Sequence, residues 1–225
     1  DHEVTRWTLP DGISMLVGDV RGGGSSTKSM VSAINSWRGH DADRAASLWD
    51  TVIAQNDKVA SCLFRVAELA RADPEGYKEA LRIREEGELP REQRSRSNSS
   101  DGDIPPANSE TSATLHTTLT VLSRCFHRLR ASMREMGIKA KVPLEPPPQT
   151  RLLDATAALK GVYGCGVPGA GGYDAVFAIY IGEAARQRVE KLWEEWADEE
   201  CGTVVVLPIA PEHIGVAVHN QVPSD

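Results

Sequence analysis

The chain has 225 residues, 40% of them hydrophobic, and a formal net charge of −7 at pH 7. This length and apolar content suffice for a full core in one large domain or two small ones. The surplus of acid argues against nonspecific nucleic-acid binding, which relies on an excess of Lys and Arg. An anionic ligand must therefore be held by a local group of donors.

The cysteines and the hydropathy pattern indicate in which compartment the protein is expected. Neither a zinc site nor a disulfide framework is predicted, because no C-x-x-C pair occurs among Cys62, Cys125, Cys165 and Cys201. No apolar run is long enough to cross a bilayer, and the N-terminus lacks the features of a signal peptide. We expect a soluble cytoplasmic protein without a metal site, with a peroxisomal location left open.

The first elements are two strands around a Pro-Asp-Gly turn at residues 10–12. This turn chemistry stands between alternating apolar runs, which is typical of a hairpin. A helix follows and ends at Gly39; its candidate N-caps are Ser25, Ser26 and Thr27.

Lys28 lies in the first turn of that helix. A Walker A loop requires glycine directly before its lysine, and Thr27 stands there instead, so the P-loop interpretation fails. A glycine-rich entry, hydroxyl groups and a lysine at a helix N-terminus still favour an anion. Ordinary helix capping explains the same residues.

Helices dominate the middle of the chain. Helical spacing of apolar residues extends from Asp43 to Ala70, and Asp73-Pro74 begins another helix. Residues 91–113 are polar and without periodicity, which predicts a flexible insertion. A further helix covers residues 119–137; its arginines are interpreted as a solvated face, with Arg130 as a candidate for an anion site.

The C-terminal part alternates helices with strands. Three prolines precede Thr150, the predicted N-cap of a short helix that ends at Lys160-Gly161. An acidic helix follows later, with a core stripe of Ala185, Val189, Leu192 and Trp196, and residues 203–209 and 215–219 read as two strands. His213 and His219 have no ligand spacing and are interpreted as structural.

Between these elements lies GCGVPGAGGYDAVFAIYI, residues 164–181. It contains a formal G-x-G-x-x-G, but a β-branched and aromatic run follows Asp174 where a dinucleotide-binding domain would open a helix. The glycines therefore lie in a loop between two strands. Such a loop either aims successive amide groups at an anion or forms a ligand-free hairpin with a bulge.

Two stretches resemble the phosphomevalonate kinases of the GHMP kinase superfamily: residues 144–179 and residues 16–31. The C-terminal glycine motif of that family corresponds to residues 169–175. Its E-P-P-x-Q-T-x-L-L-D box corresponds to Glu145, Pro146, Pro147, Gln149, Thr150, Leu152, Leu153 and Asp154. The resemblance covers most of the chain apart from residues 91–113.

The resemblance implies an α+β fold in which helices cover one face of an antiparallel, ferredoxin-like sheet. Residues 1–30 would be the end of a GHMP N-terminal domain and its connection, and residues 31–225 the GHMP kinase C-terminal domain with its insertion. The strand from Ile13 to Val20 would then lack partners in this chain and leave an exposed edge.

The implied activity is ATP-dependent phosphorylation of 5-phosphomevalonate to the 5-diphosphate in the mevalonate pathway of isoprenoid biosynthesis, with Mg²⁺ as cofactor. The family's P-x-x-x-G-L-G-S-S-A type ATP loop does not occur in this sequence, and its catalytic lysine and aspartate cannot be placed. We therefore expect a C-terminal half that is inactive alone. The alternatives are a noncatalytic binding or regulatory module and another GHMP kinase of the same pathway, against which the E-P-P-x-Q-T box argues.

The resemblance also implies roles for individual residues. Gly169, Gly171 and Gly172 would shape an anion-binding loop, Ala170 and Tyr173 would contribute amides, and Asp174 would fix the loop by accepting backbone hydrogen bonds. This loop would hold the phosphorylated substrate or the transferring phosphoryl group. Additional candidates for phosphate binding are Ser26, Thr27, Lys28 and Lys160.

Overall fold

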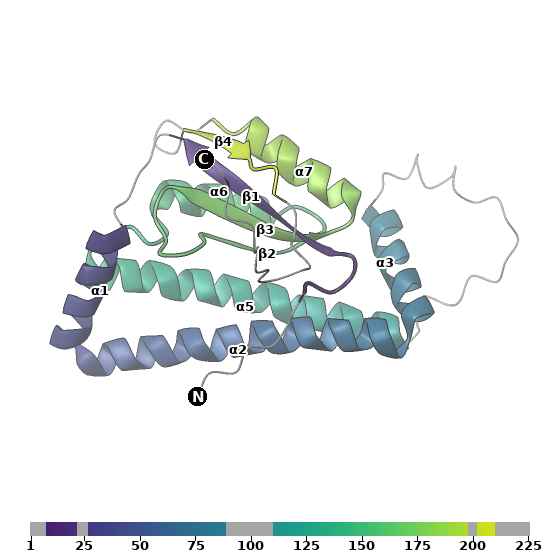
Figure 1. The fold of residues 1–225 in the computed structure, drawn as a ribbon, viewed down its shortest axis with the longest axis horizontal. Coiled ribbons are helices and arrows are strands. Elements are labelled where there is room, and N and C mark those ends of the chain that lie inside the picture. Colours follow the sequence, from purple (N-terminus) through teal and green to yellow (C-terminus); the bar gives the residue numbers. More distant parts are fainter. Residues whose placement is uncertain (1–7, 22–26, 89–109, 198–201, 210–225) are drawn as a thin grey trace, which may run out of the picture.

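A computed structural model describes residues 8–21, 27–88, 110–197 and 202–209. Its strands form a four-stranded sheet in the order β2-β3-β1-β4 (Figure 1). Strand β1 (Ile13–Arg21) pairs antiparallel with β3 (Ala175–Ile181) on one side and with β4 (Thr203–Val206) on the other, and β3 also pairs with β2 (Val162–Gly166). The expectation that the first strand lacks partners is wrong, since β1 lies inside the sheet.

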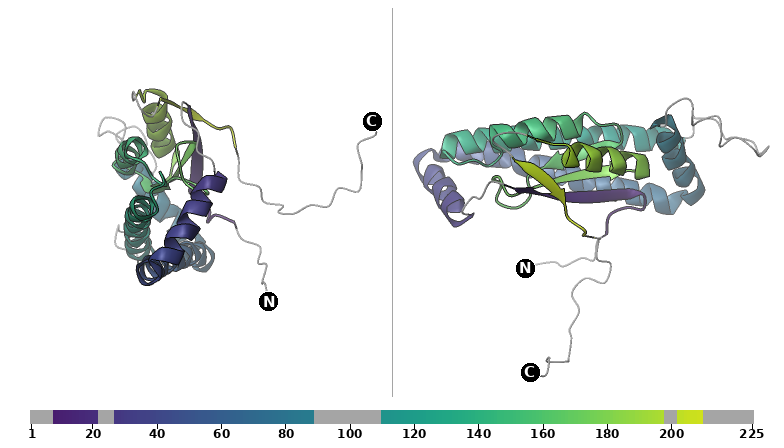
Figure 2. Two further views of the ribbon diagram at one scale, coloured as in Figure 1. Left: turned by 90° about the vertical axis from the view of Figure 1, so that its left-hand side faces the viewer. Right: turned by 90° about the horizontal axis from the view of Figure 1, so that it is seen from above.

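The described helices are α1 (Thr27–His40), α2 (Ala42–Ala72), α3 (Pro74–Glu88), α5 (Glu110–Ala140), α6 (Pro147–Ala157) and α7 (Glu183–Glu194). Helices α2 and α5 lie side by side and run in opposite directions along the molecule (Figures 1 and 2). The predicted Asp-Pro helix start is confirmed, because the Asp73 carboxylate accepts a hydrogen bond from the Gly76 amide at 3.0 Å.

Both faces of the sheet carry helices, not one face as expected. Alternate residues of β3 point to opposite sides: Val176, Ala178 and Tyr180 pack with residues of α6 and α7, whereas Ile179 and Ile181 pack with residues of α2, α3 and α5. In Figure 1, α7 lies above the strands and α2 and α5 lie below them. The almost wholly apolar sequence of β3 reflects burial on both sides.

Several boundaries differ from the sequence-based expectations. Residues 110–113 open α5 and are not part of an insertion. Helix α6 begins at Pro147, because proline is well suited to a first helical turn, so Thr150 lies inside the helix and is not its cap. The core stripe of α7 was expected to include Leu192 and Trp196. The fully buried aromatic residue of this helix is instead Trp193, and Leu192 and Trp196 are only partly buried.

Several sequence-based expectations concern residues that the structure does not describe. Residues 1–7, 22–26, 91–109 and 215–219 lie outside the described ranges, together with His213 and Cys201. Three cysteines are buried free thiols: Cys62, Cys125 and Cys165. None of the helices in the described part is long and apolar enough to cross a membrane.

Candidate functional site

The glycine loop, residues 167–174, joins antiparallel strands β2 and β3, as the sequence predicts. Three of its glycines have positive φ: 65° at Gly169, 83° at Gly171 and 111° at Gly172. Residues with a Cβ rarely adopt such angles, so the glycines set the course of the backbone.

The loop rests against the segment that begins α6, which contains the E-P-P-x-Q-T box. The Gly172 amide donates to the Leu144 carbonyl at 3.0 Å. The side-chain amide of Gln149, fully buried, donates to the Tyr173 carbonyl at 2.9 Å. Gln149, a residue of this box, therefore anchors the glycine loop to α6.

The fold brings the start of α1 to the same end of the molecule as this loop (Figure 1). Ala170 packs against a cluster that includes Met30 of α1 and Leu144. Thr27 and Lys28 are exposed in the first turn of α1, within one helical turn of Met30. Both remain candidates for phosphate binding, whereas Ser26 lies outside the described residues.

Lys160 is not brought to the loop. It precedes the first residue of β2, and the glycine loop follows the last. A strand of five residues spans about 16 Å. The backbone carbonyl of Lys160 accepts a hydrogen bond from Arg188 of α7 at 3.0 Å. Lys160 therefore lies at the other end of β2 from the glycine loop, and its role as a phosphate cation stays a prediction.

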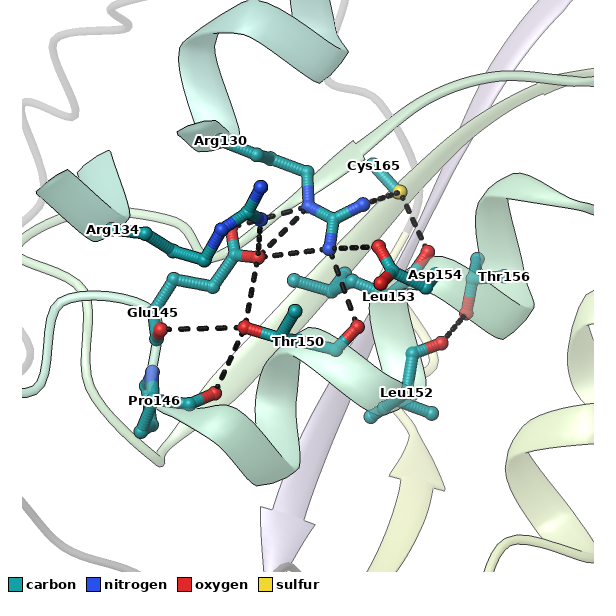
Figure 3. A network of polar contacts seen from close by, with 10 residues as sticks. All are labelled: Arg130, Arg134, Glu145, Pro146, Thr150, Leu152, Leu153, Asp154, Thr156 and Cys165. Atoms are coloured by element: carbon teal, nitrogen blue, oxygen red, sulfur yellow. Dashed lines mark hydrogen bonds and ion pairs between the residues drawn. The ribbon is translucent and has the colours of Figure 1, made fainter. Parts of the chain in front are cut away.

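Behind the loop lies a buried ionic network (Figure 3). The Arg130 guanidinium, only 4% exposed, lies 2.8 Å from the Glu145 carboxylate and 2.8 Å from that of Asp154. Arg134 binds the same Glu145 oxygen at 2.6 Å, and the side chain of Glu145 is 2% exposed. The network ties α5 to both ends of the E-P-P-x-Q-T-x-L-L-D box.

Sequence reasoning missed this network. The arginines of α5 were interpreted as a solvated face, and Arg130 as a candidate for an anion site. The available signal was the box itself, in which Glu145 and Asp154 flank apolar residues that must be buried. Because two carboxylates already neutralise Arg130, its guanidinium serves the packing of α6 on α5.

Protonation equilibria in the network follow from burial and charge. Burial acts to lower the pKa of Arg130, but its hydrogen bonds to Glu145 and Asp154 outweigh this effect and raise the pKa. Burial raises the pKa of the Cys165 thiol to about 11, although the neighbouring guanidinium opposes the shift. Cys165 is therefore protonated at neutral pH and donates to the Leu153 carbonyl at 3.3 Å.

Residues 119–199 match the family model "GHMP kinases C terminal". The chain is 30% identical over 223 residues to "Phosphomevalonate kinase, peroxisomal" of Arabidopsis thaliana, a match that covers 99% of this chain and 41% of the relative. It is 30% identical over 224 residues to a phosphomevalonate kinase of Candida albicans, which covers 96% of this chain and 43% of that protein.

A phosphomevalonate kinase of Gibberella zeae is 29% identical over 210 residues, covering 93% of this chain and 36% of the relative. The chain thus spans about two fifths of the length of these proteins. Among solved structures, it resembles a Lin0012 protein from Listeria innocua with a TM-score of 0.50 and 17% identity, over 89% of this chain and 40% of the other. That likeness concerns the fold alone, and with the family match it confirms the expected α+β architecture.

Proposed function

We propose that this chain, which carries a GHMP kinase C-terminal domain, is the substrate-side portion of a phosphomevalonate kinase. The reaction is transfer of the γ-phosphoryl group of ATP to 5-phosphomevalonate, which gives the 5-diphosphate. The observation that carries the proposal is the glycine loop held by Gln149 and Leu144, in a chain similar to phosphomevalonate kinases over nearly all its residues.

The chemistry requires positioning more than base catalysis. The nucleophile is a phosphate oxygen that is largely ionised near neutral pH, so bringing two polyanions into line and offsetting their repulsion is the main task. In our proposal the amides of Ala170 and Tyr173 and the Lys28 ammonium hold the substrate phosphate. The loop is fixed beforehand by its bonds to Gln149 and Leu144, so little reorganisation opposes binding.

ATP and Mg²⁺ are assigned to no residue of this chain. Within the described ranges, no group of three or more His, Cys, Asp or Glu side chains is placed to hold a metal ion. A kinase of this family uses ATP, and we infer that its triphosphate and metal bind to parts of the enzyme that correspond to the rest of the longer relatives. The cytoplasmic location also stays a prediction, since the Arabidopsis relative is named peroxisomal.

A chimera tests the activity. The matched region of the Candida albicans relative is replaced by this chain, and ATP-dependent conversion of 5-phosphomevalonate, mevalonate and 5-diphosphomevalonate is measured. We expect conversion of 5-phosphomevalonate, and none by the relative truncated before that region. A folded chimera that binds Mg-ATP but converts none of the three would favour the noncatalytic module, and one that converts mevalonate instead would favour another kinase of the pathway.

A further inference from the structure

A cavity borders the glycine loop, between the end of α5 and the start of α6. Its volume is about 580 Å³, within the range of small-molecule sites. Tyr173 of the glycine loop forms part of the lining. The apolar side chains of the wall are those of Ile138, Val142, Pro143, Leu144, Pro146 and Pro147.

The charged residues that line the cavity are mostly cations. They are Arg134, Lys141 and Arg151, against one carboxylate, that of Glu145. Glu145 is 2% exposed and already engaged by Arg130 and Arg134. In a chain with a net charge of −7, this is a local concentration of positive charge beside an apolar wall.

The backbone at Lys141 supports a role for its side chain. Helix α5 ends with the Val142 amide donating to the Gly137 carbonyl at 2.9 Å, and Lys141 has φ of +57°. Glycine usually fills this left-handed position after a helix. A lysine that adopts it, although glycine would do so without strain, keeps an ammonium group at the cavity.

We propose that this cavity receives the carboxylate end of 5-phosphomevalonate, an inference that rests on the proposed function. The ligand carries one anion at each end of a short carbon chain with a methyl branch. The phosphate lies at the glycine loop, the carboxylate lies toward Lys141 and Arg151, and the methyl branch packs on the apolar wall. Cation–carboxylate hydrogen bonds give this end its recognition.

Calorimetry with two ligands tests the assignment. The 225-residue chain is titrated with 5-phosphomevalonate and with isopentenyl monophosphate, which shares the branched chain and the phosphate but lacks the carboxylate. We expect Lys141→Gln and Arg151→Gln each to weaken binding of 5-phosphomevalonate about tenfold and to leave isopentenyl monophosphate unchanged. The matched control is Lys139→Gln, an exposed lysine of α5 that does not line the cavity.

Lys141→Gly separates the structural from the binding role. Glycine suits φ of +57°, so this variant should melt at or above the temperature of the wild type while it loses the same tenfold affinity. Equal weakening of both ligands would show that the phosphate lies in the cavity, and would overturn the assignment.

The assignment would also be overturned if Lys141→Gln, Arg151→Gln and Lys141→Gly all bound 5-phosphomevalonate as tightly as the wild type. It would likewise be overturned if the wild type bound the two ligands equally or bound neither. The proposed function would fail separately, by a folded chimera that converts no 5-phosphomevalonate.

Discussion

Gly169 and Gly171 of the glycine loop differ in the space that surrounds them. A Cβ built on Gly171 would lie 2.5 Å from the Leu144 carbonyl oxygen, whereas one on Gly169 meets no atom within 4 Å. Both have positive φ, so alanine at Gly169 should cost about 1 kcal/mol and alanine at Gly171 about 3 kcal/mol or more. Urea unfolding of the two variants measures the difference, and similar midpoints would contradict the close approach of the loop to Leu144.

Removal of the Arg130 guanidinium should be among the most damaging changes on α5. Arg130→Met leaves the buried Glu145 with Arg134 as its ionic partner, and truncation of one partner of a buried pair costs about 3–5 kcal/mol. The control is Arg128→Met, at an exposed position of the same helix, for which about 0.5 kcal/mol is expected. Denaturant midpoints that fall equally in the two variants would refute the structural role of the network.

Alkaline pH should weaken the fold through Cys165. Its pKa rises from 9.0 to about 11 on folding, so the folded chain holds this proton more tightly than the unfolded chain. The stabilisation is complete below pH 9 and is lost as the pH rises through about 11, by at most about 3 kcal/mol. Unfolding free energies measured from pH 8 to 11 should fall less steeply in Cys165→Ala, and parallel pH profiles would argue against this origin.

At the scale of elements, the glycine loop depends on α6. Gln149→Met keeps the volume of the side chain but leaves the Tyr173 carbonyl without its donor, at a cost of about 1–3 kcal/mol. We expect hydrogen exchange of the Gly172 amide to be much faster in this variant than in the wild type. Exchange of the Ile179 amide in β3 should be accelerated far less. Equal acceleration at both amides would mean that the bond supports the whole sheet and not the loop.

Patterns local in sequence predicted the elements well, and contacts distant in sequence escaped them. Helical spacing gave α2 from Asp43 to Ala70, close to the observed Ala42–Ala72, and turn chemistry gave the β2–β3 hairpin. The pairing of β1 with β3 joins residues more than 150 positions apart, which no local period encodes. No local period predicts the ion pairs of Arg130 either, because its partners Glu145 and Asp154 lie on a later segment.

At the scale of the whole molecule, strand β1 from the start of the described chain pairs with strands β3 and β4 near its end. It separates β3 from β4, and its Leu16 and Val20 belong to the core that also contains Trp193 of α7. The sequence-based boundary at residue 30 assigns this strand to another domain, and that assignment stays a prediction. In the structure, residues 13–21 pair with β3 and β4, which favours the alternative that this strand folds with the C-terminal sheet.

A truncation decides between these interpretations. A chain that begins at residue 27 lacks β1, leaves β4 without its antiparallel neighbour and exposes the core face that Leu16 and Val20 cover. We expect it to lose the single cooperative thermal transition of the full chain, measured by circular dichroism. A synthetic peptide of residues 8–21, added in trans, should restore the transition by strand addition. A truncated chain that melts cooperatively without the peptide would instead place β1 outside the domain, and the boundary near residue 30 would stand.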